Sequence, residues 1–151
     1  MTTYLDTSFL VSLYTPDANS ASALKAIHAA AGPFPLTSFC QLELTNAVEL
    51  RVFRHEITAA ESKQVLAALA SDLVSGFLRS TPAPATVYDE ALRLSRRHTA
   101  ALGNRTLDIL HVAAALALGL PTLYTFDRRQ AQLARAAGLK TPIRIRSLAA
   151  P

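Results

Sequence analysis

The chain has 151 residues, of which 50% are hydrophobic and 17% are charged. This length suits one domain with a sizeable core rather than two independent cores, and the composition excludes an intrinsically disordered chain. Fifteen basic and eleven acidic residues give a net charge of +4, a modest bias toward polyanionic partners such as nucleic acids.

The cysteine content and the apolar runs bear on the cellular compartment. Cys40 has no second cysteine with which to form an intrachain disulfide or a thiolate metal site, so we expect a buried thiol in a cytoplasmic protein. Asp6 interrupts the N-terminal apolar run, which argues against a secretory signal. The longest apolar stretch, Val112 to Leu120, is far shorter than the roughly 20 residues that span a bilayer. We therefore expect no membrane segment.

Short apolar runs alternate with segments of helical periodicity along the whole chain. This alternation is typical of an α/β domain built on a parallel sheet. We expect about five strands, with helices between them. The expected strands are Thr3 to Leu5, Phe34 to Thr37, Phe77 to Ser80, Thr122 to Phe126 and Ile143 to Arg146.

Two capping patterns predict a helical hairpin between the second and third strands. Ser38 with Gln41, and Thr58 with Glu61, match the capping box, in which each side chain satisfies an unpaired amide of the other residue. After the second of these starts, apolar residues recur at helical spacing until Gly76 ends the run.

Three further helices are predicted in the second half of the chain. In residues 85–101 the apolar positions lie on one side and Arg93, Arg96 and Arg97 on another, so this basic cluster is either a solvated face or an RNA contact. Leu107 to Leu118 is apolar nearly all round, as expected for a helix packed against the sheet. The last helix, Arg128 to Ala137, is followed by Gly138 in a typical C-terminal position.

Four acidic residues are placed where the strands of such a fold would bring them together. Asp6 and Asp127 directly follow the first and fourth strands, Glu43 lies in the helix after the second strand, and Asp108 opens the deep apolar helix. Loops that follow parallel strands gather at one edge of the sheet, where binding sites form. We therefore expect the four carboxylates to converge.

Each acid also has a purely structural explanation. Asp6 and Asp127 are suited to capping helices, Asp108 to a helix N-terminus, and Glu43 to an exposed helix face. These explanations leave the grouping unaccounted for, because converging carboxylates repel one another unless a cation neutralises them. An all-oxygen donor set favours Mg²⁺ or Mn²⁺ over Zn²⁺.

Four segments, in this order, resemble the PIN-domain family, in particular the VapC-like toxins of bacterial toxin–antitoxin pairs. They are Tyr4-Leu5-Asp6-Thr7-Ser8-Phe9-Leu10, Glu43 in its helix, Arg105-Thr106-Leu107-Asp108-Ile109-Leu110-His111 and Leu123-Tyr124-Thr125-Phe126-Asp127-Arg128-Arg129. The resemblance implies a three-layer α/β/α sandwich with strand order 3-2-1-4-5, formed by one domain over residues 1–151. It also implies endoribonuclease activity with one or two Mg²⁺ ions, for which Mn²⁺ would substitute.

The resemblance assigns roles to individual residues. Asp6, Glu43, Asp108 and Asp127 match the family's acids, and Thr125 matches its small hydroxyl residue. Other residues are placed by their own chemistry. Glu49, on the same helix as Glu43, takes the place of Glu43 in the site if the register of the helix is shifted. Ser8 or Thr7 would orient an acid by a hydrogen bond, and Arg105 would contact phosphate or pair with a carboxylate. His111 is expected to be a core residue outside the site.

The resemblance also implies partners, namely an RNA substrate, a cognate antitoxin whose C-terminal segment covers the acidic pocket, and a second copy in a homodimer. The apolar residues Phe9, Leu10, Val11 and Leu13 would line the antitoxin groove or pack in the core. A different reading is a catalytically inactive PIN-like module that binds RNA or a partner.

Two other protein classes fit less well. A haloacid-dehalogenase-like hydrolase would need an acid where Ser8 stands, and a response-regulator receiver would need a basic residue in the region of Asp127.

Overall fold

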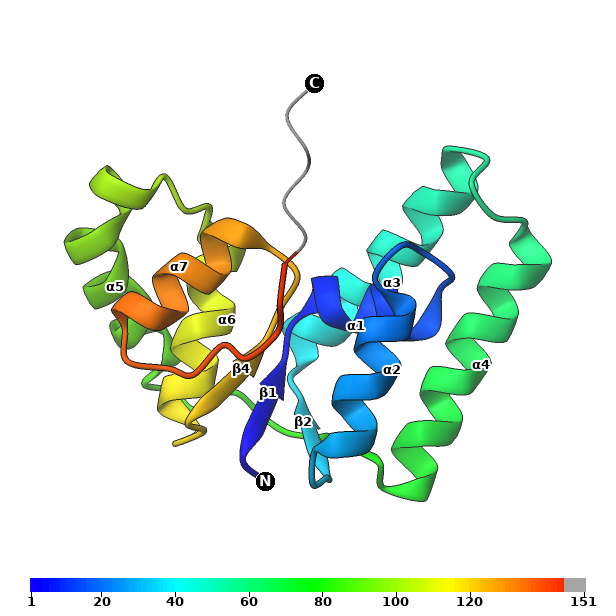
Figure 1. Ribbon diagram of the computed structural model, residues 1–151, viewed down its shortest axis with the longest axis horizontal. Coiled ribbons are helices and arrows are strands. Elements are labelled where there is room, and N and C mark those ends of the chain that lie inside the picture. The colour runs from blue at the N-terminus through cyan, green and yellow to red at the C-terminus, as the bar shows by residue number, and fades with distance from the viewer. Residues whose placement is uncertain (146–151) are drawn as a thin grey trace.

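The computed structural model describes residues 1–145, which form four short strands and seven helices (Figure 1). In chain order they are β1 (Thr3–Leu5), α1 (Thr7–Tyr14), α2 (Ser20–Ala29), β2 (Phe34–Leu36), α3 (Ser38–Phe53), α4 (Ala59–Ser75), β3 (Leu78–Ser80), α5 (Val87–Leu102), α6 (Thr106–Ala117), β4 (Thr122–Tyr124) and α7 (Arg128–Ala136). The first four expected strands and the predicted helices are therefore present; β1 has the predicted bounds, and the other three strands are one or two residues shorter than predicted.

The strands form two parallel pairs at the centre of the molecule. β1 pairs with β4, with Tyr4 opposite Leu123, and β2 pairs with β3, with Pro35 opposite Arg79. β1 also contacts β2, and Figure 1 shows the two strands side by side. Both pairs agree with the expected order 3-2-1-4-5, but no ladder of hydrogen bonds joins β1 to β2 within residues 1–145.

The prediction of a fifth strand at Ile143 to Arg146 is wrong for its first three residues, and Arg146 lies outside the described residues. The chain approaches β4 earlier: the amide of Leu123 donates to the carbonyl of Lys140, and Lys140 forms an isolated parallel bridge with Thr122. Pro142 supplies no amide hydrogen to extend this pairing, which explains why no strand follows.

The helices pack around the strands in two groups, each with its own hydrophobic cluster. Helices α5, α6 and α7 lie beside β4, whereas α1 to α4 lie on the other side of β1 (Figure 1). Neighbouring residues of a strand point to opposite faces. Accordingly, Tyr4 packs in the first cluster with Val112 and Leu123, whereas Leu5 packs in the second with Phe9.

The helix ends test the capping predictions. The capping box of Thr58 and Glu61 is formed, and Gly76 ends α4 with a positive φ of 80°. The capping box predicted for Ser38 and Gln41 is wrong, because the residue before α3 is Thr37 and no side chain caps that helix. Thr37 is buried, and its hydroxyl lies 3.1 Å from the Tyr4 hydroxyl instead.

None of the helices in residues 1–145 is both long and apolar enough to cross a bilayer. The nearly uncharged helix α6, the expected deep helix, has 12 residues. It is buried along most of its length between α5, α7 and β4.

Candidate active site

A cleft of about 450 Å³ lies at the carboxyl ends of β1 and β4, and all four acids singled out in the sequence line it. Asp6 and Asp127 follow those two strands, Glu43 comes from α3 and Asp108 from the first turn of α6. Parallel strands bring their following loops to the same edge, which accounts for the convergence.

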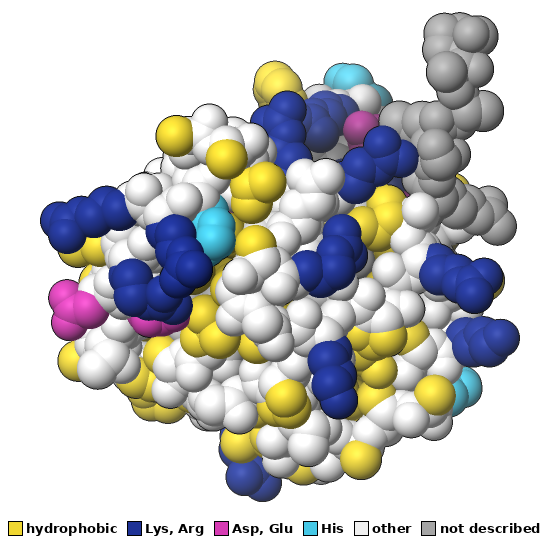
Figure 2. Space-filling model, turned by 60° about the vertical axis from the view of Figure 1, so that its left-hand side comes forward, with side chains coloured by type: hydrophobic (Ala, Val, Ile, Leu, Met, Phe, Trp, Pro, Cys, Tyr) yellow, Lys and Arg dark blue, Asp and Glu magenta, His cyan; other side chains and the backbone are white. Residues whose placement is uncertain are grey.

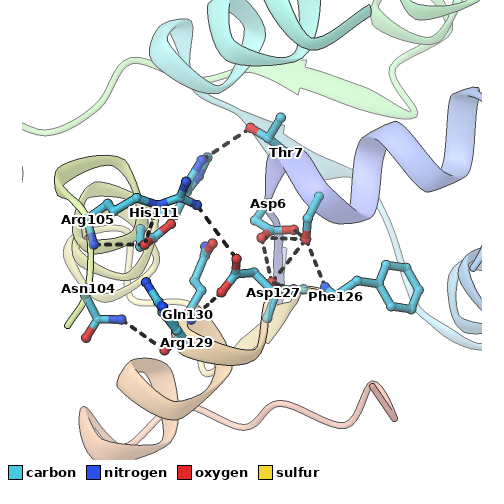
Figure 3. A network of polar contacts seen from close by, with 12 residues as sticks. Asp6, Thr7, Asn104, Arg105, His111, Phe126, Asp127, Arg129 and Gln130 are labelled. Atoms are coloured by element: carbon cyan, nitrogen blue, oxygen red, sulfur yellow. Dashed lines mark hydrogen bonds and ion pairs between the residues drawn. The ribbon is translucent and has the colours of Figure 1, made fainter. Parts of the chain in front are cut away.

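Asp6 is the most deeply buried of the four acids, with 1% of its surface exposed. Its Oδ1 accepts a hydrogen bond from the Phe9 amide at 2.8 Å and so caps α1. Its Oδ2 accepts from the Thr125 hydroxyl at 2.6 Å, and the Ser8 hydroxyl lies 2.9 Å from both oxygens (Figure 3). Ser8 and Thr125 therefore fix the orientation of this carboxylate.

Burial makes the charged form of Asp6 costly. It raises the pKa of the carboxyl to about 6, although the positive charge of His111 and the hydrogen bonds from Thr125, Phe9 and Ser8 work in the opposite direction. Each of the hydrogen-bond donors that reach Asp6 within residues 1–145 is neutral. A buried carboxylate without a cationic hydrogen-bond partner is suited to binding a cation.

Glu43 also lines the cleft and is held by a second set of contacts. Nε2 of His111 lies 2.6 Å from Oε2 of Glu43, and the Thr7 hydroxyl donates to the same oxygen. Partial burial raises the pKa of Glu43, but the hydrogen bonds from His111 and Thr7 outweigh it and keep the pKa below its usual value. Glu43 is therefore ionised at neutral pH.

His111 connects Glu43 to the core. Its Nδ1 lies 3.1 Å from the Tyr4 hydroxyl, and its ring packs against Phe39 at a centroid distance of 5.2 Å. Burial raises the pKa of Tyr4 well above its ordinary value, so the phenol stays protonated. His111 is buried, as predicted, but it also lines the cleft and contacts Glu43, which was not predicted from the sequence. Its place one helical turn after Asp108 was the signal in the sequence.

Asp108 and Asp127 share one basic partner, Arg105. Asp108 accepts hydrogen bonds from the backbone amide of Arg105 at 2.9 Å and from its Nε at 3.4 Å. Nη2 of Arg105 lies 3.9 Å from Oδ2 of Asp127 (Figure 3). Asp127 also caps α7 by accepting from the Gln130 amide at 2.8 Å. Of the two roles open for Arg105, the structure shows the pairing with carboxylates.

The structure also distinguishes Glu43 from its rival on the same helix. Glu49 accepts a hydrogen bond from the Ser62 hydroxyl of α4 at 2.6 Å and does not line the cleft. It ties α3 to α4. One acid in the cleft wall was missed in the sequence, namely Asp17, which accepts a hydrogen bond from Ser12 at 2.8 Å.

The donor set of the cleft fits a hard divalent cation. Carboxylate and hydroxyl oxygens are prominent among the groups that line it, and these are ligands that Mg²⁺ and Mn²⁺ prefer. In the part of the chain that the structure describes, however, no three His, Cys, Asp or Glu side chains are grouped as a metal site. His111 holds Glu43, and Arg105 holds Asp108 and Asp127. The Arg105 side chain is 74% exposed, so it is free to move away when a cation binds.

Comparisons with known proteins agree with this architecture. The structure is similar to that of Mycobacterium tuberculosis VapC20, a sarcin–ricin loop cleaving toxin, with a TM-score of 0.68 and 20% identity over 92% of this chain and 97% of that one. It is also similar to FitAcB from Neisseria gonorrhoeae, with a TM-score of 0.65 and 19% identity over 88% and 93%. A toxin–antitoxin complex from Klebsiella pneumoniae gives a TM-score of 0.65 and 15% identity over 95% and 100%.

At these identities the three structures establish the fold alone. No curated relative matches the chain in sequence. The family model of the PIN domain matches residues 3–136, which is most of the chain. The chain therefore belongs to the PIN domain family.

Proposed function

We propose that this protein is a Mg²⁺-dependent endoribonuclease and the toxin of a type II toxin–antitoxin pair, with Mn²⁺ able to substitute. The observation that carries the proposal is the convergence of Asp6, Glu43, Asp108 and Asp127 on one cleft of a PIN domain. Paired carboxylates at such an edge are suited to holding cations against a phosphodiester.

The residues of the cleft have distinct roles in this proposal. Asp6, Glu43 and Asp108 hold the metal, and Asp127 completes the pocket. Ser8 and Thr125 keep the Asp6 carboxylate in one orientation through the hydrogen bonds described above. When bound, the ion would lower the pKa of a water molecule and stabilise the charge on the leaving oxygen.

The protein's own side chains govern two further steps. Asp6 must give up its proton before it can hold a cation, and its pKa of about 6 makes this complete only above neutral pH. Arg105 must release Asp108 and Asp127, after which its exposed guanidinium is available to a phosphate of the substrate.

The proposed substrate and partners rest on the similar structures. VapC20 is a toxin that cleaves the sarcin–ricin loop, and the Klebsiella pneumoniae structure is a toxin–antitoxin complex. We accordingly propose RNA as the substrate and an antitoxin as a protein partner. We further propose a homodimer, a cytoplasmic location and one domain over residues 1–151. We also propose that the two observed strand pairs join into one continuous sheet with the order 3-2-1-4.

The competing function is a PIN-like module that binds RNA or a partner without cleaving it. Metal-dependent cleavage separates the two functions.

To test for it, purified protein should be incubated with total bacterial RNA in Mg²⁺, in EDTA, and in EDTA followed by excess Mg²⁺. We expect cleavage that EDTA abolishes and Mg²⁺ restores. Asp6→Asn should be inactive, whereas Glu56→Gln, a charge change on the surface of the α3–α4 connection, should be as active as the parent. Equal cleavage by Asp6→Asn and the parent would contradict the metal role.

A further inference from the structure

The charges of this protein are distributed unevenly between its two halves. Residues 1–86 contain five basic and seven acidic residues, whereas residues 87–145 contain nine basic and four acidic ones. The second segment forms α5, α6, β4 and α7, which pack together beside β1. The positive charge of the chain is therefore concentrated on one side of the cleft.

Most of the basic side chains on this side have no acidic partner. Arg93 pairs with Glu90, and Arg105 pairs with Asp108 and Asp127. The other seven make no ion pair within residues 1–145 and are all exposed. They are Arg96, Arg97, Arg128, Arg129, Arg135, Lys140 and Arg144.

Figure 2 shows this side of the molecule turned forward. Dark-blue basic side chains are spread across the face, and magenta acidic ones appear only at its left edge and near its top. A separate hollow on α5 is lined by Arg93, Arg96 and Arg97 together with Asp89 and Leu92. Basic side chains without acidic partners repel one another, so the binding of a polyanion to this face is electrostatically favourable.

The basic side chains of α7 begin at the rim of the cleft. Arg128 and Arg129 form the start of α7, directly after the cleft residue Asp127. The Asn104 side chain donates to the carbonyl of Arg129 at 3.0 Å and so joins the end of α5 to that turn. Arg96 and Arg97 lie about 8 Å along the helix axis before the end of α5 at Leu102. α5 and α7 contact each other directly.

We infer that the five arginines Arg96, Arg97, Arg128, Arg129 and Arg135, here called the basic face, bind the phosphate backbone of the RNA outside the scissile site. This inference rests on the proposed ribonuclease function. Guanidinium groups match phosphate oxygens with two parallel hydrogen bonds, and exposed arginines on two neighbouring helices suit a repeating polyanion. RNA approaches the cleft over α5 and α7, because the first half of the chain is net acidic.

The experiment separates binding from cleavage. All binding variants carry Asp6→Asn and are measured in EDTA by fluorescence anisotropy with a labelled hairpin RNA over a range of salt concentrations. The double variant Arg96→Gln/Arg97→Gln should bind RNA on the order of tenfold more weakly at low salt. The slope of log affinity against log salt concentration should become less steep by about two. The control Lys25→Gln/Lys63→Gln makes the same charge change on α2 and α4 and should bind as the background does.

Three results would overturn the inference. The first is an unchanged affinity of Arg96→Gln/Arg97→Gln for RNA, and the second is an equal weakening by the control pair. The third is binding of polyglutamate as tight as that of RNA, which would indicate an acidic protein as the partner.

Cleavage tests the proposed function separately. With Asp6 restored, Arg96→Gln/Arg97→Gln should have a raised KM and an unchanged kcat on the hairpin. A parent that binds RNA through these arginines without cutting it would refute only the nuclease.

Discussion

Nε2 of His111 lies 2.6 Å from Oε2 of Glu43, and the other ring nitrogen lies 3.1 Å from the Tyr4 hydroxyl. Because Tyr4 stays a phenol, its hydroxyl can hydrogen-bond to Nδ1 and hold the ring so that Nε2 faces Glu43. A buried side chain of β1 thus sets the direction of a carboxylate in the cleft.

Removing His111 should therefore impair the cleft without abolishing the fold. We expect His111→Ala to lower Mn²⁺ affinity by about tenfold to a hundredfold, as is usual when a group that orients a ligand is lost. Tyr4→Phe should give a smaller loss, because the ring of His111 still reaches Glu43. Isothermal titration calorimetry with Mn²⁺ measures both. An unchanged affinity for His111→Ala would show that Glu43 needs no such support.

The two glutamates of α3 form a matched pair for testing the metal site. Glu43→Gln should abolish most RNA cleavage and weaken Mn²⁺ binding. Glu49→Gln should leave both unchanged, since Glu49 contacts Ser62 rather than the cleft. Loss of activity in Glu49→Gln with a retained thermal midpoint would reverse this assignment.

The raised pKa of Asp6 gives a defined dependence of stability on pH. The carboxyl titrates near 3.8 when exposed and near 6 in the folded protein, so between these values the folded state holds more protons than the unfolded one. The free energy of unfolding therefore falls as the pH rises through this window, and the loss is nearly complete at about pH 7, roughly one unit above the folded-state pKa. For the fully buried group this amounts to about 3 kcal/mol.

Asp6→Asn lacks this titration and keeps a good capping residue for α1. In EDTA it should unfold at a higher temperature than the parent at pH 7 and at nearly the same temperature near pH 4. Thermal unfolding followed by circular dichroism checks both. A variant less stable than the parent at pH 7 would show that the charged carboxylate is not the source of strain.

Arg105 competes with a cation for Asp108 and Asp127. Its side chain is mostly exposed, and exposed ion pairs are worth at most about 1 kcal/mol. Arg105→Gln should therefore bind Mn²⁺ up to about fivefold more tightly, whereas the exposed Arg54→Gln should not differ from the parent. Weaker Mn²⁺ binding by Arg105→Gln would mean that Arg105 helps to assemble the site.

Several parts of the fold follow from local sequence patterns, and the exceptions have physical causes. The capping box at Thr58 formed because nothing else competes for its exposed side chains. At Ser38 the same pattern failed, since the preceding residue, Thr37, is drawn into the core by Tyr4. Helix α2 begins after Asn19 without a side-chain cap, so its start left no signal.

The candidate site was predictable where it depended on topology. Residues that follow parallel strands had to meet, which placed Asp6 near Asp127, and α6 brought Asp108 to them. The contacts of His111 and Arg105 were not predictable, because they depend on side-chain rotamers and on which acid lies within reach. Glu43 and Glu49 differ by less than two helical turns, and only the packing of α4 against α3 through Ser62 separates their roles.

Three consecutive residues serve three different parts of the molecule. Tyr4 packs in the hydrophobic cluster of α5 to α7, Leu5 packs in that of α1 to α4, and Asp6 lines the cleft. A genetic screen for variants that no longer harm the host cell would thus recover changes at all three positions, but for different reasons. Changes at Tyr4 or Leu5 would lead to degradation of a misfolded chain, whereas changes at Asp6 would remove the chemistry from an intact one. Cellular protein levels, measured alongside survival, would assign each variant to its class.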